Sequence, residues 1–131
     1  MIRRFHGAKE AKADEVLIWG TGKPRRELMY VDDLAKGVLF LLKQEDPPDW
    51  VNLGTGVDHS IIEIAGLVKQ ALGFNGKIVH DLSKPDGMPL KRLDVSLATA
   101  LGWSAETQLE NGIKLAYEDF LKGIEAGTTR L

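Results

Sequence analysis

The 131-residue sequence contains no cysteine. This absence excludes disulfides, thiolate nucleophiles and cysteine-ligated metal sites, and it favours a reducing, cytoplasmic location. No apolar run approaches the roughly 18 residues that a membrane-spanning helix needs, and the first residues lack the apolar core of a signal peptide. We therefore expect a cytoplasmic chain that does not associate with membranes.

The sequence also has little excess charge of either sign. Its 17 basic and 19 acidic residues are interspersed and give a net charge of -2. This balance excludes a broad basic surface for nucleic acid, so any anion site must be local. The three histidines, His6, His59 and His80, show no paired metal-ligand spacing, and no metal site is expected. A hydrophobic fraction of 44% is typical of one globular domain.

Short apolar runs alternate with amphipathic segments along the chain, which predicts an α/β fold with short strands and about five helices. The expected helices cover 2–12, a segment beginning at 32 or 33, 61–72, 95–101 and a segment beginning at 107, and the expected strands cover 16–19, 28–31, 50–53 and 77–80.

Three of these helices carry signals at their first residues. Ser60 with Glu63, and Thr107 with Glu110, have the spacing of a capping box. Asp32 and Asp33 are adjacent carboxylates that could serve catalysis or bind a cation. Their position at a helix start favours the interpretation that one of them is the N-cap, because acidic side chains there meet free N–H groups.

Two Gly-Thr-Gly turns, at 20–22 and 54–56, each follow a strand candidate and resemble the start of a dinucleotide fingerprint. That fingerprint needs a third glycine three residues after the second. Arg25 and His59 stand at those positions. Neither turn is therefore predicted to bind a dinucleotide.

Arg25 and Arg26 follow the first of these turns and suggest an anion site. A guanidinium matches phosphate oxygens in two-point geometry, but a solvated hairpin tip explains the pair equally well. Strand alternation allows only one of the two arginines to face a site. The loop 83–94 adds Lys84, Lys91 and Arg92, with Asp86 at a turn.

Taken together, these features resemble one family. RRFH (3–6), WGTGKPRREL (19–28), YVDDLA (30–35), NLGTG (52–56), SKPDG (83–87), LD (93–94) and LGW (101–103) occur in this order in the C-terminal part of GDP-L-fucose synthases. RREL, YVDD and NLGTG are widespread among nucleotide-sugar epimerases and dehydratases. RRFH, the Trp-Gly-x-Gly turn and SKPDG are more specific, and the resemblance runs from about residue 1 to residue 121.

The resemblance implies an extended short-chain dehydrogenase/reductase that converts GDP-4-keto-6-deoxy-mannose to GDP-L-fucose with NADPH. It implies a substrate-binding region over 1–122, and the residues 123–131, which end Gly-Thr-Thr-Arg-Leu, are expected to form a loose tail. Arg26 would bind the diphosphate of the GDP-sugar, Trp19 would pack on the ligand, and Arg4 would add charge or hydrogen bonds. Asp86 would hold the ribose or base, and Lys91 a phosphate. Leu90 stands where the family usually has arginine, which predicts a weaker phosphate grip.

The family's catalytic and cofactor motifs are expected upstream of the point that matches Met1. Neither the NADP-binding glycine motif nor the Tyr-x-x-x-Lys pair occurs in this sequence. We therefore expect no catalytic residue and no cofactor in this chain, most of the Rossmann domain being absent. His6 is not expected to replace the family's catalytic histidine.

The resemblance also implies that the helix over 33–44 and the strand over 50–53 would pack against a parallel sheet of the cofactor domain. Without that sheet their apolar surface is exposed, so a homo-oligomer formed through this face is expected. Two alternatives remain open at this point. The chain could be a binding or assembly module without the ligand, or the substrate half of another nucleotide-sugar epimerase or dehydratase.

Overall fold

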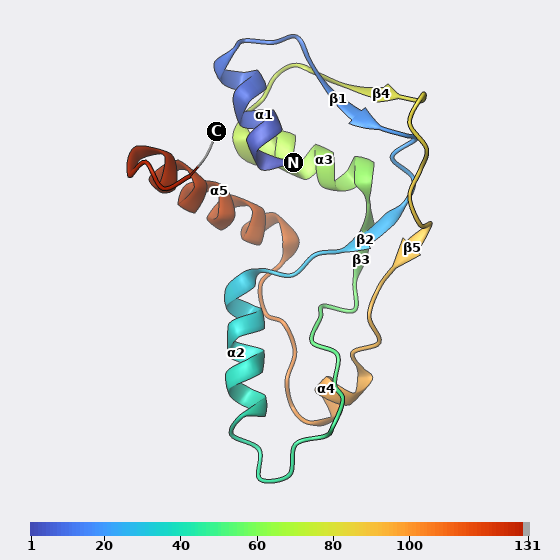
Figure 1. Ribbon diagram of the computed structural model, residues 1–131, viewed down its shortest axis with the longest axis vertical. Helices are drawn as coiled ribbons and strands as arrows, with labels where there is room; N and C mark the ends of the chain where they lie inside the picture. Colours follow the sequence, from blue (N-terminus) through green and yellow to red (C-terminus); the bar gives the residue numbers. More distant parts are fainter. Residues whose placement is uncertain (130–131) are drawn as a thin grey trace.

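The computed structural model describes residues 1–129 and contains five helices and two small sheets (Figure 1). The expected α/β class, with short strands and about five helices, is confirmed. The elements in chain order are α1 (Ile2–Glu10), β1 (Glu15–Trp19), β2 (Arg25–Glu27), α2 (Val31–Leu41), β3 (Asp58–Ser60), α3 (Ile61–Leu72), β4 (Lys77–Asp81), β5 (Leu90–Lys91), α4 (Ser96–Ala100) and α5 (Leu109–Glu125).

The strands form two separate sheets. β1 and β4 pair in parallel, and the second sheet has the order β3-β2-β5, in which β2 is antiparallel to β3 and parallel to β5. In Figure 1 these strands follow one side of the molecule, whereas α1, α3 and α5 lie on the other side. The sheet β3-β2-β5 therefore joins the first sheet to the part of the chain that holds α2 and α4.

The core lies between β1 and the helices α1, α3 and α5. β1 alternates strictly, so that Val16 and Ile18 are buried while its other residues face outward. Phe5 of α1 is fully buried and meets Phe74 edge to face, with 5.6 Å between ring centroids. α3 supplies most of the remaining core side chains, namely Ile64, Ala65, Val68 and Leu72.

Two expected strands are wrong. Residues 28–30 are irregular, and the strand lies earlier, at β2, because the ladder with β3 ends at Glu27 and the ladder with β5 ends at Arg26. Residues 50–53 are extended without a ladder, and the strand after them is β3. A strand needs a partner for its N–H and C=O groups, and within residues 1–129 neither segment has one.

The predicted caps had mixed outcomes. The capping box of Ser60 and Glu63 is confirmed in both directions, with Glu63 N to Ser60 Oγ at 3.2 Å and Ser60 N to Glu63 Oε2 at 2.7 Å. The second capping box is wrong, because Gln108 occupies the N-cap of α5 and makes no side-chain cap. The N-cap of α2 is Tyr30, so neither Asp32 nor Asp33 caps that helix through its side chain.

Asp33 instead joins α2 to the segment before α5. Its side chain is 2% exposed, and Oδ2 accepts hydrogen bonds from Glu106 N at 3.1 Å and Thr107 N at 2.7 Å. Oδ1 has no hydrogen-bond partner among the described residues and lies 3.8 Å from Lys36 Nζ. Burial alone would raise the pKa of Asp33, but the hydrogen bonds from Thr107 and Glu106, with Lys36, lower it below its ordinary value.

The last described residues are held against the end of α5. This helix continues to Glu125, and Thr128 N and Thr129 N then donate to Gly123 O at 2.9 and 3.0 Å. Residues 130 and 131, which the expected tail includes, lie outside the described residues. The boundary between 122 and 123 stays a prediction.

α2 presents an apolar face to solvent. Five large side chains on it or near it are exposed: Leu34 41%, Val38 45%, Leu39 57%, Leu42 76% and Trp50 87%. A patch of this kind is typical of a surface that another protein segment covers. It is no membrane span, because none of the helices described here combines the required length with sufficient apolar character.

We predict that Asp33→Ala destabilises the protein by about 1–3 kcal/mol, because it leaves the part-buried backbone N–H groups of Glu106 and Thr107 without their acceptor. Urea unfolding at neutral pH measures this loss. Because the pKa of Asp33 is lowered by folding, its contribution is complete above the pKa of the unfolded state and is lost as the pH falls through the folded value. Asp32→Ala, an exposed neighbour, is the control, and equal unfolding midpoints for the two variants would contradict the assignment.

Candidate functional site

A cavity of about 490 Å³ opens between the first residues of α1, the end of β1, β2 and the loop after β4. Four of the five predicted ligand-binding residues line it: Arg4, Trp19, Arg26 and Asp86. These residues come from four separate segments of the sequence. The structure therefore brings together side chains that sequence spacing alone could not group.

Backbone carbonyls hold both arginines of this cavity. Arg4 Nη1 donates to Leu17 O at 2.7 Å, and Arg26 Nη1 donates to Met88 O and Arg25 O, each at 2.7 Å. Each guanidinium carries five N–H donors, so several remain for a ligand. Two oriented guanidiniums on one cavity can bind a diphosphate.

Trp19 provides a flat aromatic surface at the edge of the cavity. It is the last residue of β1, and the strand's alternation turns it outward, so that 62% of it is exposed. Lys84 Nζ lies 5.8 Å from the centroid of the Trp19 ring, within the range of a cation–π contact. A ring that stacks on Trp19 would share this surface with the Lys84 ammonium.

Asp86 is already engaged within the protein. Its Oδ1 accepts a hydrogen bond from Thr21 N at 2.8 Å, and its Oδ2 accepts one from Thr21 Oγ1 at 2.6 Å. These bonds, the one from the hydroxyl first, hold the pKa of the Asp86 carboxyl below its ordinary value. A ligand that Asp86 binds must use the lone pairs that Thr21 leaves free.

Lys91 does not line the same cavity. It faces a neighbouring hollow of about 420 Å³, of which Arg26 is also a wall. Lys91 is the register partner of Arg26 in the β2–β5 pair, so the two side chains leave the sheet on the same face. A ligand that touches both residues must therefore pass along the Arg26 guanidinium.

Of the two adjacent arginines, only Arg26 lines either hollow. Arg25 forms an ion pair with Asp58 through Nε, and its Nη1 lies 3.6 Å from Glu63 Oε2. Arg92 Nη1 also reaches Asp58, at 3.2 Å. The hydrogen bond from Arg25, followed by its charge and that of Arg92, lowers the pKa of the Asp58 carboxyl.

Glu27 supports this site, and sequence analysis missed it. Its carboxylate accepts hydrogen bonds from the backbone N–H groups of Thr55, of Gly56 at 3.0 Å and of Leu93 at 2.7 Å. It thereby links the loop before β3 and the loop after β5 to β2, the strand that carries Arg26. No local pattern could have revealed this role, because the donors are 28 to 66 residues away.

The two Gly-Thr-Gly turns share one function in the fold. Thr21 N donates to Asp86, while Thr55 N and Gly56 N donate to Glu27. These N–H groups are the donors that a bound phosphate would require. Carboxylates of this chain accept from these three N–H groups, so the turns hold the Asp86 and Glu27 side chains in place.

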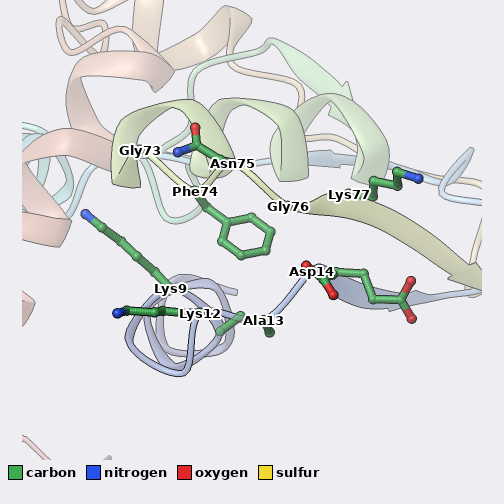
Figure 2. A pocket seen from close by; sticks show the side chains of 11 residues that line it. Lys9, Lys12, Ala13, Asp14, Gly73, Phe74, Asn75, Gly76 and Lys77 are labelled. Carbon is green, nitrogen blue, oxygen red and sulfur yellow. The ribbon is translucent and has the colours of Figure 1, made fainter.

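A larger hollow of about 740 Å³ lies away from these residues, between the end of α1 and the segment 73–77 (Figure 2). Figure 2 shows Phe74 pointing toward α1, whereas Lys9 and Lys12 belong to the α1 side of the hollow. Lys9 Nζ donates to Leu72 O, at the end of α3, at 2.7 Å. This hollow contains none of the predicted ligand-binding residues. Among residues 1–129, no three His, Asp or Glu side chains gather as a metal site.

The sequence pattern of the NAD dependent epimerase/dehydratase family matches residues 1–54. GDP-L-fucose synthase 1 of Arabidopsis thaliana is 44% identical over 124 residues, which cover 95% of this chain and 38% of that protein. GDP-L-fucose synthase of Escherichia coli (strain K12) is 39% identical over 131 residues, covering 93% of this chain and 41% of the relative.

Solved structures of related enzymes are similar to this chain as well. A GDP-L-fucose synthetase from Naegleria fowleri, determined with NADP bound, superposes with a TM-score of 0.84 at 26% identity, covering 98% of this chain and 40% of the other. A GDP-mannoheptose C4 reductase from Campylobacter jejuni, with NADP bound, gives a TM-score of 0.78 at 36% identity, with 89% and 42% covered. The chain thus spans about two fifths of the length of these relatives.

We predict that Glu27→Gln destabilises the protein by about 1–3 kcal/mol, because an amide NH₂ would face one of the backbone donors. The pKa of Glu27 is lowered, since the hydrogen bonds from Leu93, Gly56 and Thr55 outweigh the effect of burial, which alone would raise it. The stabilisation is therefore complete above the unfolded pKa and is lost as the pH falls through the folded one.

Urea unfolding between pH 7 and pH 3 tests this prediction. The wild type should lose more stability than Glu27→Gln over that range, and the two should converge at low pH. Glu15→Gln, an exposed change at the start of β1, is the control. Parallel pH profiles for wild type and Glu27→Gln would contradict the assigned role.

Proposed function

Because this chain belongs to the extended short-chain dehydrogenase/reductase enzymes and matches a segment of the GDP-L-fucose synthases, we propose that it binds a GDP-sugar. The resemblance expected from the sequence is confirmed at the level of the family. The ligand, the site residues and the role of the chain by itself are our proposals.

The convergence of Arg4, Trp19, Arg26 and Asp86 on one cavity carries this proposal. Two guanidiniums held by backbone carbonyls suit the charge and shape of a diphosphate. An exposed aromatic ring at the same cavity suits a sugar or a base. This combination supports a nucleotide-sugar as the ligand.

We assign the roles as follows. Arg26 binds the diphosphate, and Arg4 adds charge or hydrogen bonds to it. Trp19 packs on the ligand, and Asp86 accepts from ribose hydroxyls or from the base. Lys91 contacts a phosphate from the neighbouring hollow, on the same face of the sheet as Arg26.

We propose that this chain supplies substrate binding and that hydride and proton transfer belong to the remaining part of the family's fold. The relatives are about two and a half times as long as the matched segment, and two related structures contain NADP. We also propose that the two Gly-Thr-Gly turns do not bind NADP, since the N–H groups of Thr21, Thr55 and Gly56 already donate to Asp86 and Glu27. We place the chain in the cytoplasm, for which its lack of cysteine is the support.

Calorimetric titration of the 131-residue chain with GDP, GDP-fucose, UDP and dTDP tests the proposed ligand. We expect saturable binding of the GDP ligands and weaker binding of UDP and dTDP. Preference for UDP or dTDP would favour a different nucleotide-sugar enzyme. No binding of any of them at millimolar concentration would favour an assembly module.

We predict that Arg26→Ala weakens GDP binding about 10- to 100-fold, the effect of losing a charged hydrogen bond to phosphate. Arg26→Lys should fall in between, because it keeps the charge but not the two-point geometry. Arg4→Ala should also weaken binding, whereas Arg3→Ala, an exposed neighbour on α1, is its control. Wild-type affinity in Arg26→Ala would exclude the assigned role.

We further propose that, without the rest of the family's fold, the exposed face of α2, together with Trp50, is covered by a second copy of this chain. Multi-angle light scattering at micromolar concentration should give a mass above 14.4 kDa. The double variant Leu39→Lys/Leu42→Lys should shift the mass toward the monomer. Leu82→Lys, which changes a leucine that is 71% exposed elsewhere, should not. A monomeric wild type would refute this proposal.

A further inference from the structure

Residues 84–89, which we call the strap, connect the candidate site to the turn between β1 and β2. Lys84 lies over the Trp19 ring, and Asp86 binds Thr21. The first half of the strap therefore contacts the residue at the end of β1 and the turn that follows it.

The second half of the strap contacts both arginines of β2. Met88 O accepts from Arg26 Nη1 at 2.7 Å, and Pro89 O accepts from Arg25 N at 2.8 Å. A Cβ atom on Gly87 would lie 3.1 Å from Arg26 Nη2. The position of the Arg26 guanidinium is therefore set by the strap as well as by its own strand.

Thr21 is the residue that holds the middle of the strap. Gly20 and Gly22 on either side of it have φ of +71° and +73°, values that side-chain-bearing residues rarely adopt. This backbone lets both the amide and the hydroxyl of Thr21 face the Asp86 carboxylate, at 2.8 and 2.6 Å. A Cβ atom on Gly20 would lie 2.2 Å from Asp86 Oδ1, so the close approach requires glycine there.

We propose that Thr21 is a positioning residue for the diphosphate of the ligand. It holds Asp86, and through the strap it keeps the Arg26 guanidinium in the orientation that binds an anion. This inference rests on the proposed function and deepens it.

Thr21 acts through other residues rather than on the ligand. It is absent from the lining of the cavity, whereas Arg26, Asp86 and Gly87 all belong to it. Its hydroxyl also accepts from Lys23 N at 3.2 Å, which leaves the hydroxyl hydrogen to donate to Asp86. The Thr21 side chain therefore joins the turn and the strap with one donor and one acceptor.

The test compares Thr21→Val, which removes the hydroxyl at nearly constant volume, with Thr21→Ser, which retains it. By calorimetry with GDP, Thr21→Val should bind about tenfold more weakly or worse, and Thr21→Ser within about twofold of wild type. Thr99→Val, the same change at an exposed hydroxyl of α4, is the control and should not affect affinity. Urea midpoints identify any variant that weakens binding merely by unfolding.

Amide hydrogen exchange provides a second measurement that needs no ligand. Arg25 N and Thr21 N donate to the strap, so their exchange should accelerate in Thr21→Val but not in Thr21→Ser or Thr99→Val. Unchanged exchange in Thr21→Val would overturn the inference that Thr21 holds the strap.

The two measurements separate this inference from the proposed function. If the wild type binds GDP and Thr21→Val binds it equally well, positioning by Thr21 is refuted and the binding function stands. If the wild type does not bind GDP, the proposed function fails, and with it the role of Thr21 in anion binding. The exchange rates then still decide whether Thr21 orders the strap.

Discussion

Carboxylates that accept hydrogen bonds from loop N–H groups hold this fold together. No strand in the described chain exceeds five residues, so strand ladders alone cannot fix the long connections between them. Glu27 binds the loop before β3 and the loop after β5, Asp86 binds the turn after β1, and Asp33 binds the segment before α5. Each bond is charge-assisted and satisfies a backbone donor that would otherwise need water. Each of these carboxylates therefore links segments that lie far apart in the sequence.

The candidate site follows from the same constraint. Arg26 projects from a strand of only three residues, yet its guanidinium is anchored to the strap, and its strand is fixed by Glu27. A side chain that is already held in place loses less conformational entropy when a ligand binds, so the entropic cost of binding is lower. Asp58 contributes by drawing Arg25 away on the opposite face, which leaves Arg26 as the arginine of the pair that lines the cavity.

The parts of the fold that the sequence predicted correctly are those that depend on neighbouring residues. The capping box of Ser60 and Glu63 spans three residues, and both hydrogen bonds form. Asp33 is not the expected cap, because the backbone groups that its side chain binds are 73 and 74 residues away. The expected strands over 28–31 and 50–53 had the right composition, but composition cannot supply a ladder partner. Family motifs placed Arg4, Trp19, Arg26 and Asp86 together, whereas Glu27 and Thr21 act through contacts that no local motif encodes.

Leu90 shows how the geometry changes an argument made from the motif alone. The missing arginine at this position predicted a weaker phosphate grip. In the β2–β5 pair, however, Leu90 is the register partner of Arg25, while Lys91 is the partner of Arg26. Successive residues of a strand leave its sheet on opposite faces, so a side chain at position 90 points to the side of Arg25 and Asp58 rather than to the hollow that Arg26 shares with Lys91. An arginine there would compete with Arg25 and Arg92 for the Asp58 carboxylate, which already binds both. Leucine at this position therefore leaves Arg26 and Lys91 on the face of the candidate site unchanged, and it avoids placing a third guanidinium around one carboxylate.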